Sequence, residues 1–251
     1  MNIYESDKLL AEYLLFHYGT AEETLPFDFA PRNGLAYPVR CVTECLDAST
    51  LPPAARALDL GCAVGRSTFE LARHAGEVIG IDFSQRFIEA AQILQSNGEL
   101  PYRRTDEGEL VTDLVARVPQ EIDRTRVRFE TGDAMRLRSD LGTFDIVLMA
   151  NLIDRLSDPE SCLERLPLLV RRHGQLIITS PYTWMEEFTP KERWLGGIQR
   201  DGRALTTLDG LRAALDDVFE FIEVRNLPFL IREHARKYQW SVAQASLWRR
   251  R

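Results

Sequence analysis

The feature that most constrains the fold is a short apolar segment that ends beside an acidic residue and runs into a glycine loop. Residues 57–60 read Ala-Leu-Asp-Leu, and Gly61 and Gly65 bracket the loop that follows. A second apolar segment, 78–81, leads into Asp82. Glycines permit a tight strand-to-helix turn and let the backbone approach a ligand closely. An acid at the end of the next strand suits the two hydroxyls of a ribose, as in nucleotide-binding folds generally.

The spacing of the glycines indicates which kind of nucleotide such a loop would hold. The loop reads Gly-x-x-x-Gly and not Gly-x-Gly-x-x-Gly, which disfavours a dinucleotide. Asp59 precedes the loop, Asp82 follows it, and Gly132-Asp133-Ala134 comes further on. In this order the motifs resemble the cofactor site of class I S-adenosylmethionine-dependent methyltransferases. The resemblance implies a Rossmann-like fold with S-adenosylmethionine as its cofactor.

Length and composition favour one α/β domain with additions. A chain of 251 residues with 45% hydrophobic content can bury a sizeable core. The net charge of -7 argues against a surface devoted to nucleic-acid phosphates. We expect no metal site, because the four cysteines and four histidines lack metal-ligand spacing. No segment reads as a signal peptide or approaches the roughly 18 apolar residues of a membrane span, so we expect a cytoplasmic protein without a membrane partner.

Alternating strand and helix patterns predict a doubly wound, mostly parallel seven-stranded sheet with its ligand at the carboxyl ends of the strands. Two final strands, 219–224 and 239–248, are predicted to be antiparallel. The other strands are predicted at 56–60, 77–82, 127–130, 144–150 and 175–180, and the helices between and after them at 65–74, 85–97, 158–171 and 207–216.

Three segments are predicted to decorate this sheet. Residues 1–53 form an N-terminal helical cap, with helices within 4–18 and 38–48, ahead of a methyltransferase domain over 54–251. Residues 98–126 look like a polar insertion with a helix around 109–118. Residues 181–205 are too aromatic for a mere linker and predict a second lid, after the fifth strand.

Four residues are expected at the amino acid end of the cofactor. This end carries an ammonium group, which suits an acid such as Asp59, and it needs the close backbone approach that Gly61 and Gly65 allow. Asn151, just past the fourth strand, lies where its carbonyl and side chain can bound the methionine end. Each of these residues taken alone is better explained as a polar cap at a strand end, and it is their combined order and spacing that favours binding of a nucleotide or methyl donor.

Four more residues are expected at the adenosine end. Asp82 should accept hydrogen bonds from the ribose hydroxyls, and its neighbour Phe83 is assigned to the same site. Asp133 should meet the adenine amino group, with the backbone of Ala134 nearby.

A closer resemblance extends over nearly the whole chain. The sequence is similar to the methyltransferase domain of ovothiol biosynthesis, the family of 4-mercaptohistidine N1-methyltransferases. Family members carry this domain at the C-terminus of a sulfoxide synthase, whereas this sequence begins at Met1 with the methyltransferase alone. The resemblance therefore implies a free-standing enzyme for a thiol- or selenol-substituted histidine, of ovothiol or ovoselenol type, with the chalcogen left open. The stretches that carry it are 59–67, 150–156, 179–189, 194–197, 206–211 and 232–239.

The resemblance implies methyl transfer to an imidazole ring nitrogen. A neutral imidazole nitrogen already has a lone pair, so placement in line with the methyl group matters more than a strong base. Carboxylates near the ring would stabilise the positive charge that develops on it. Asn151 and Tyr182 are predicted to orient the ring as catalytic residues.

Substrate binding is assigned to residues that follow the fourth and fifth strands and to the two ends of the chain. Arg155 or Arg232 is predicted to meet the substrate carboxylate bidentately. The alternatives are a local ion pair for Asp154–Arg155 and lid packing for Trp184. The full substrate set is Tyr4, Asp154, Arg155, Tyr182, Trp184 and Arg232, and the N-terminal residues Asp7, Tyr13 and His17 are expected to help close the pocket.

Two rival functions stay open at this point. One is a methyltransferase for another small metabolite, and the other is a non-catalytic S-adenosylmethionine-binding module whose aromatic lid contacts a partner. Turnover of the cofactor would separate an enzyme from a binding module. A small-molecule substrate is the expected partner, nucleic acid is not, and the oligomeric state is unknown.

Overall fold

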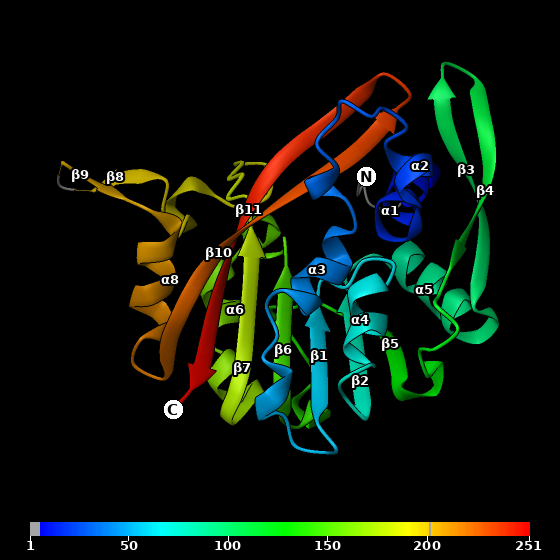
Figure 1. The fold of residues 1–251 in the computed structure, drawn as a ribbon. Coiled ribbons are helices and arrows are strands. Elements are labelled where there is room, and N and C mark those ends of the chain that lie inside the picture. Colours follow the sequence, from blue (N-terminus) through cyan, green and yellow to red (C-terminus); the bar gives the residue numbers. More distant parts are fainter. Residues whose placement is uncertain (1–5, 201) are drawn as a thin grey trace.

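The computed structural model describes residues 6–200 and 202–251, and its centre is a seven-stranded sheet with the order β10-β11-β7-β6-β1-β2-β5 (Figure 1). Strands β7, β6, β1, β2 and β5 are parallel, whereas β10 and β11 are antiparallel to each other and β11 is antiparallel to β7. This confirms the predicted doubly wound, mostly parallel sheet. The strands are β1 (Arg56–Leu60), β2 (Glu77–Asp82), β5 (Val127–Thr131), β6 (Phe144–Ala150), β7 (Val170–Ser180), β10 (Phe219–His234) and β11 (Lys237–Arg250).

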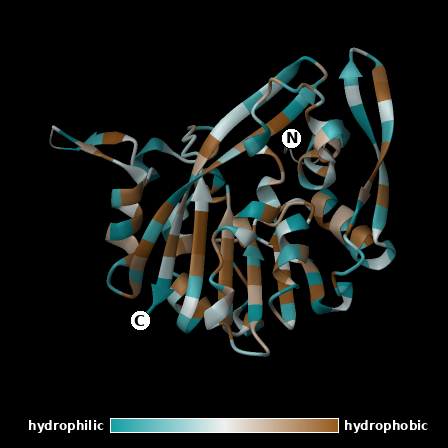
Figure 2. Cartoon of the chain, in the orientation of Figure 1, coloured by the Kyte–Doolittle hydropathy of each residue, from teal (hydrophilic) through white to brown (hydrophobic). Residues whose placement is uncertain are grey.

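The central strands are buried on both faces, as near-continuous apolar strands of a parallel sheet should be. Ala57 and Ile146 belong to one hydrophobic cluster, and their neighbours Leu58 and Val147 to the other, because successive side chains point to opposite faces. Figure 2 shows the hydrophobic colour concentrated along these strands. Burial on two faces requires helices on both sides of the sheet.

The strand order reverses between β1 and β6, and open α/β sheets bind their ligands at such a switch point. From β1 the chain passes through the glycine loop into α4 (Arg66–Leu71), and from β2 into α5 (Gln85–Asn97). The Ser84 hydroxyl accepts a hydrogen bond from the Phe87 amide and so caps α5, as its sequence position predicts. The motif loops therefore meet at one edge of the sheet.

The N-terminal helices lie over the carboxyl ends of the strands, beside the β10–β11 hairpin (Figure 1). Leu14, Tyr37 and Cys41 belong to the same hydrophobic cluster as the sheet residue Ala57. The cap therefore shares a core with the sheet, and the boundary at residue 53 stays a prediction. Its helices are α1 (Asp7–Tyr18), α2 (Ala21–Thr24) and α3 (Tyr37–Thr43).

The prediction of a helix around residues 109–118 is wrong. Residues 98–126 instead contain an antiparallel two-stranded sheet, formed by β3 (Glu99–Glu107) and β4 (Leu110–Arg117). The β-branched residues Val111, Thr112 and Val115 favour a strand. Gly108, at φ 55, supplies the left-handed residue of the turn between the strands.

The other differences between the prediction and the structure concern the lengths of helices and strands. The predicted helix 158–171 is two short helices, α6 (Pro159–Leu163) and α7 (Leu166–Leu169), and β7 starts earlier than expected. The two last strands are antiparallel as predicted but extend to residues 234 and 237, where they meet in a hairpin. Leu227 and Phe229 on this extension pack into the core that the cap also enters. The lid segment contains the short hairpin of β8 (Ile198–Arg200) and β9 (Arg203–Leu205), and α8 (Thr207–Leu215) follows it.

In the part of the chain that the structure describes, no helix is both long and apolar enough to cross a membrane.

Candidate active site

A cavity of about 440 Å³ opens at the carboxyl ends of β1, β2 and β6. Its walls come from the glycine loop, the end of β2, residues 132–135 and residues 150–157. Helix α1, Tyr37 and Pro38 of α3, two lid residues and Ile231 of β10 complete the enclosure. Segments far apart in the sequence therefore surround the position where the motifs predict a cofactor.

Asp82 joins the two motif loops at the wall of this cavity. Its Oδ2 accepts a hydrogen bond from the Ala63 amide at 2.9 Å, and its Oδ1 accepts one from the Ser84 amide at 2.8 Å. Gly61, at φ 73, also lines the cavity, and its amide donates to the Ile81 carbonyl at 2.8 Å. These bonds orient the Asp82 carboxylate at the cavity wall, where the motif predicts the ribose hydroxyls.

Asp59 lies behind the wall and does not line the cavity. Its Oδ2 accepts hydrogen bonds from the hydroxyls of Ser67 and Thr68, at 2.8 and 2.7 Å, and Ser67 lines the cavity. Among the described residues no partner exists for Oδ1, although the side chain is fully buried. Burial raises the pKa of the Asp59 carboxyl to about 6. A buried carboxylate oxygen without a partner fits the ammonium group of S-adenosylmethionine.

Gly65 has a role that differs from the predicted one, because it is not part of the cavity wall. Its φ of +86 is in the left-handed region, and a Cβ there would lie 2.5 Å from Cζ of Phe129. Glycine is needed here so that the start of α4 can pack against β5. The expectation that Gly65 lets the backbone approach the cofactor is therefore corrected, because this glycine is needed for packing against Phe129.

The residues predicted for the adenosine end are together at the cavity wall. Phe83 is 68% exposed and presents a flat ring beside Asp82. Oδ1 of Asp133 accepts a hydrogen bond from the Met135 amide at 2.9 Å, which orients this carboxylate at the wall. Ala134 lies next to it. These positions fit an adenosine held by its ring edge and its ribose.

Asn151 is at the cavity wall and is tied to residues that no sequence signal linked to it. Its backbone is left-handed, with φ 51, which asparagine tolerates better than most residues. Its amide donates to the Thr179 carbonyl at 2.8 Å, and its Oδ1 accepts a hydrogen bond from the Tyr37 hydroxyl at 2.7 Å. Tyr37, which also lines the cavity, is the main residue that sequence reasoning missed.

Arg155 reaches the cavity, whereas Asp154 supports it from behind. Oδ2 of Asp154 accepts hydrogen bonds from Arg155 Nη1 and from the Thr183 amide, both at 2.9 Å. The pKa of Asp154 is raised, because burial outweighs the opposing charge of Arg155. The guanidinium carbon of Arg155 lies 4.9 Å from the centre of the Phe188 ring, which also lines the cavity. The local ion pair weighed as an alternative is therefore present, and Arg155 still faces the site.

The structure does not bring Tyr182 and Trp184 into the cavity wall. The Tyr182 hydroxyl donates to Gln244 Oε1 at 3.1 Å, and the Trp184 indole N–H donates to Thr207 Oγ1 at 2.9 Å. Trp184 also stacks on Trp194, with ring centres 6.1 Å apart. Both predicted substrate residues serve to hold the lid segment, because their polar atoms are already paired there.

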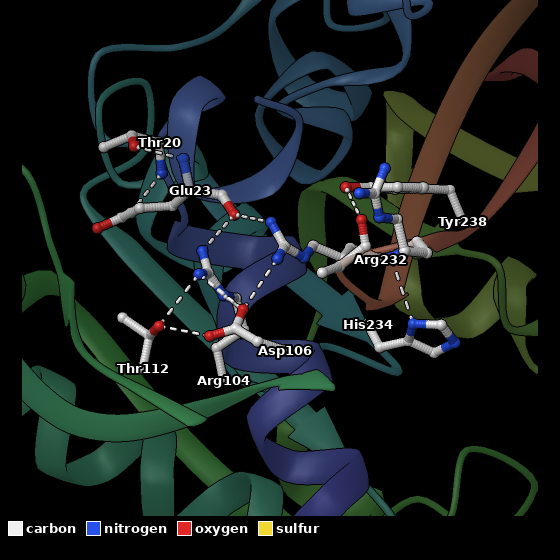
Figure 3. Close-up of polar contacts among 10 residues, drawn as sticks. Thr20, Glu23, Arg104, Asp106, Thr112, Arg232, His234 and Tyr238 are labelled. Carbon is white, nitrogen blue, oxygen red and sulfur yellow. Dashed lines mark hydrogen bonds and ion pairs between the residues drawn. The ribbon is translucent and has the colours of Figure 1, made fainter. Parts of the chain in front are cut away.

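Arg232 is not placed to bind a substrate carboxylate. Its side chain is buried and donates to the Glu23 carbonyl at 2.8 Å and to Oδ1 of Asp106 at 3.0 Å. Figure 3 shows Arg232 and Arg104 converging on Glu23 and Asp106. The assignment of Arg232 to the substrate is therefore corrected, and Arg155 is the arginine that faces the cavity. Tyr4, the remaining predicted substrate residue, lies outside the described residues.

Helix α1 closes the cavity as expected, through Tyr13 and His17, and Phe16 joins them. Burial lowers the pKa of His17 to about 3, so its imidazole is neutral. Asp7 does not reach the site and forms an ion pair with Arg86 of α5. The apolar spacing of α1 indicated a buried face but not what that face would cover.

Part of the chain matches a known protein family. Residues 58–178, slightly less than half of the chain, match the family described as a methyltransferase domain. No curated protein sequence matches the chain.

Three similar solved structures share the fold. A methyltransferase from Methanosarcina mazei has a TM-score of 0.53 at 16% identity, covering 80% of this chain and 95% of its own. N-methyltransferase NodS from Bradyrhizobium japonicum, in complex with S-adenosyl-L-homocysteine, has a TM-score of 0.52 at 14% identity, covering 96% and 98%. The YcgJ protein from Bacillus subtilis has a TM-score of 0.51 at 15% identity, covering 80% and 94%. These structures show that the chain has a Rossmann-like methyltransferase fold, and the match of residues 58–178 to a methyltransferase domain supports S-adenosylmethionine as the cofactor.

Proposed function

We propose that this chain transfers a methyl group from S-adenosylmethionine to a ring nitrogen of a histidine that bears a thiol or selenol. The observation that carries the proposal is the composition of the cavity wall beyond the cofactor residues. The aromatic residues Phe16, Tyr37 and Phe188 line it, together with the cationic Arg155 and the acidic Glu187. Aromatic side chains pack well against a flat ring such as imidazole. A concave cavity of this size favours a small acceptor over a polymer.

The two charged residues suit an amino acid. The Arg155 guanidinium can bind a carboxylate bidentately, and Glu187 offers an acceptor to an ammonium group. Arg155 Nη1 is held by the carbonyl of Thr183 at 2.9 Å and by Asp154, which leaves the other guanidinium N–H groups for a ligand. One cation and one anion at the same cavity complement a zwitterionic substrate.

Methyl transfer depends on the orientation of the ring nitrogen more than on a general base. When bound, S-adenosylmethionine supplies an electrophilic methyl group on its sulfonium sulfur. The ring nitrogen attacks with its lone pair, so that the N–C bond forms as the sulfur–methyl bond breaks, and the ring then returns a proton to solvent. The aromatic wall and Arg155 would hold the nitrogen in line with the methyl group, which lowers the barrier to transfer.

Mass spectrometry of the products tests the proposal. The purified protein is incubated with S-adenosylmethionine and with histidine, 4-mercaptohistidine or its selenium counterpart. We expect N-methyl products from the substituted rings and much less product from histidine. Methylation on sulfur or selenium alone, or equal rates with histidine, would overturn it. Cofactor turnover with a different amino acid would favour the rival enzyme, and binding without any turnover would favour the non-catalytic module.

A further inference from the structure

Three residues from separate elements form a closed ring of hydrogen bonds beside the cavity. The backbone N–H of Asn151 donates to the backbone carbonyl of Thr179 at 2.8 Å, and the Tyr37 hydroxyl donates to the side-chain Oδ1 of Asn151 at 2.7 Å. The Tyr37 and Thr179 hydroxyl oxygens lie 2.6 Å apart. Thr179 is fully buried and Tyr37 is 2% exposed, so neither hydroxyl has water as a substitute partner.

The direction of each bond in the ring follows from the number of protons. A phenol has one O–H proton, and Tyr37 gives it to Asn151 Oδ1. The proton between the two hydroxyls must then come from Thr179. Burial raises the pKa of Tyr37 well above its ordinary value, so the phenol keeps its proton. The two side-chain hydrogen bonds therefore form a relay that runs from Thr179 through Tyr37 to Asn151.

This direction decides which polar atom of the Asn151 side-chain amide is free to bind a ligand. Oδ1 is occupied by Tyr37, and in the described part of the chain no acceptor is found for Nδ2. Asn151 lines the cavity, so its NH₂ group is a donor available to a ligand there. The backbone of Asn151 is held by the Thr179 carbonyl, and its side chain is held by the Tyr37 hydroxyl.

We propose that Thr179 and Tyr37 are positioning residues that fix the Asn151 NH₂ group toward the cavity, where it binds the thiolate or selenolate of the substrate. This inference rests on the proposed function. The chalcogen is more nucleophilic than the ring nitrogen, and a hydrogen bond from Asn151 turns it away from the sulfonium methyl group. The relay thus determines that nitrogen is methylated instead of sulfur or selenium.

Substitutions along the relay test its effect on the product. Tyr37→Phe and Thr179→Val should each lower the ratio of N-methyl to S-methyl product from 4-mercaptohistidine, Tyr37→Phe by about tenfold, the effect of one lost hydrogen bond. Thr179→Ser keeps the hydroxyl and should retain the ratio. Phe229→Leu is the packing control, because its ring lies 4.8 Å from that of Tyr37 and is not part of the cavity wall. An unchanged ratio in Tyr37→Phe, or an equal change in Phe229→Leu, would overturn the inference.

A second measurement tests the relay without any substrate. The Tyr37 hydroxyl proton should give a slowly exchanging proton resonance that disappears in Tyr37→Phe and shifts in Asn151→Ala. A resonance that does not depend on Asn151, or none at all, would refute the relay. If wild type does not methylate 4-mercaptohistidine but shows this resonance, the proposed function fails and the substrate role of the relay fails with it, while the fixed amide stands.

Discussion

Arg232 on β10 donates a hydrogen bond to Asp106 on β3 over 3.0 Å, across 126 positions of sequence. Arg104 donates to the same carboxylate, and both arginines donate to the Glu23 carbonyl at the end of α2, at 2.8 and 2.7 Å (Figure 3). Burial alone would raise the pKa of Asp106, but the hydrogen bonds from Thr112 and Arg104 outweigh it and lower that pKa. These contacts hold the β3–β4 and β10–β11 hairpins against the N-terminal helix α2.

Arg232→Met should destabilise the fold and leave substrate binding nearly unchanged. We expect the free energy of unfolding to fall by about 1–3 kcal/mol, because Glu23 and Asp106 lose a buried donor while Arg104 remains. Urea unfolding and the KM for substrate measure the two effects. Arg155→Met should raise the KM and also lower stability, because the buried Asp154 loses its cation, whereas Arg103→Met, whose ion pair with Asp113 is exposed, should change neither. A raised KM with unchanged stability in Arg232→Met would restore it as a substrate ligand.

Asp82→Ala should weaken cofactor binding. Loss of the carboxylate leaves the ribose hydroxyls without an acceptor, which corresponds to about tenfold to a hundredfold in affinity. Calorimetric titration with S-adenosylhomocysteine measures the change, and the exposed Asp140→Ala serves as its control. Equal affinity in both variants would refute the ribose assignment.

Gly65→Ala should impair folding before it affects binding. The new Cβ would meet the Phe129 ring at 2.5 Å, at a backbone φ of +86 that side chains rarely adopt. We expect a lower melting temperature, partly recovered when Phe129→Leu is added, since the two residues are in contact. A stable Gly65→Ala protein that has lost only cofactor affinity would contradict this reading.

Cofactor binding should release protons near pH 6. The raised pKa of Asp59, about 6, leaves about half of the carboxyls protonated at that pH, and a bound ammonium group would favour the ionised form. Titrations with S-adenosylhomocysteine in two buffers of different ionisation enthalpy should therefore differ at pH 6 and agree at pH 8. Asp59→Asn should remove the difference. Identical heats in both buffers at pH 6 for wild type would show that Asp59 does not sense the ligand.

His17 should make the protein acid-sensitive. Its pKa is about 3 in the folded protein and about 6.5 when unfolded, so the unfolded chain binds the extra proton between these values. Its contribution to stability is complete above about pH 6.5 and is lost as the pH falls toward 3, by about 2 kcal/mol between pH 7 and pH 5. Urea unfolding of His17→Gln should lack this loss, whereas His173→Gln, at an exposed position, should keep it. The raised pKa of Asp59 has the opposite effect, because it favours folding as the pH falls. The contribution of His17 is therefore measured by comparing His17→Gln with wild type and His173→Gln.

The local motifs are where sequence reasoning succeeded, because their physical causes lie within a few residues. The apolar run into Asp59 predicts a buried strand, and the run into Asp82 predicts the next one. Ser84 predicts the start of a helix by its capping hydroxyl. Parallel strands bring their carboxyl ends to one edge, so Asp82, Asp133 and Asn151 were expected together, and they line one cavity. Order and spacing along the chain were enough for these conclusions.

The partners of individual side chains were decided only by the tertiary structure. Arg232 and Arg155 are equally plausible carboxylate ligands in the sequence, but packing of two hairpins against α2 buries the first and leaves the second at the cavity. Tyr37 reaches Asn151 across 114 positions because the cap shares a core with the sheet. The sequence by itself determined the sheet, the cofactor loops and the class of ligand, since each follows from local periodicity and turn chemistry. The orientation of the Asn151 amide and the loss of Arg232 from the site depend on contacts between distant segments, which only the packed chain brings within hydrogen-bonding distance.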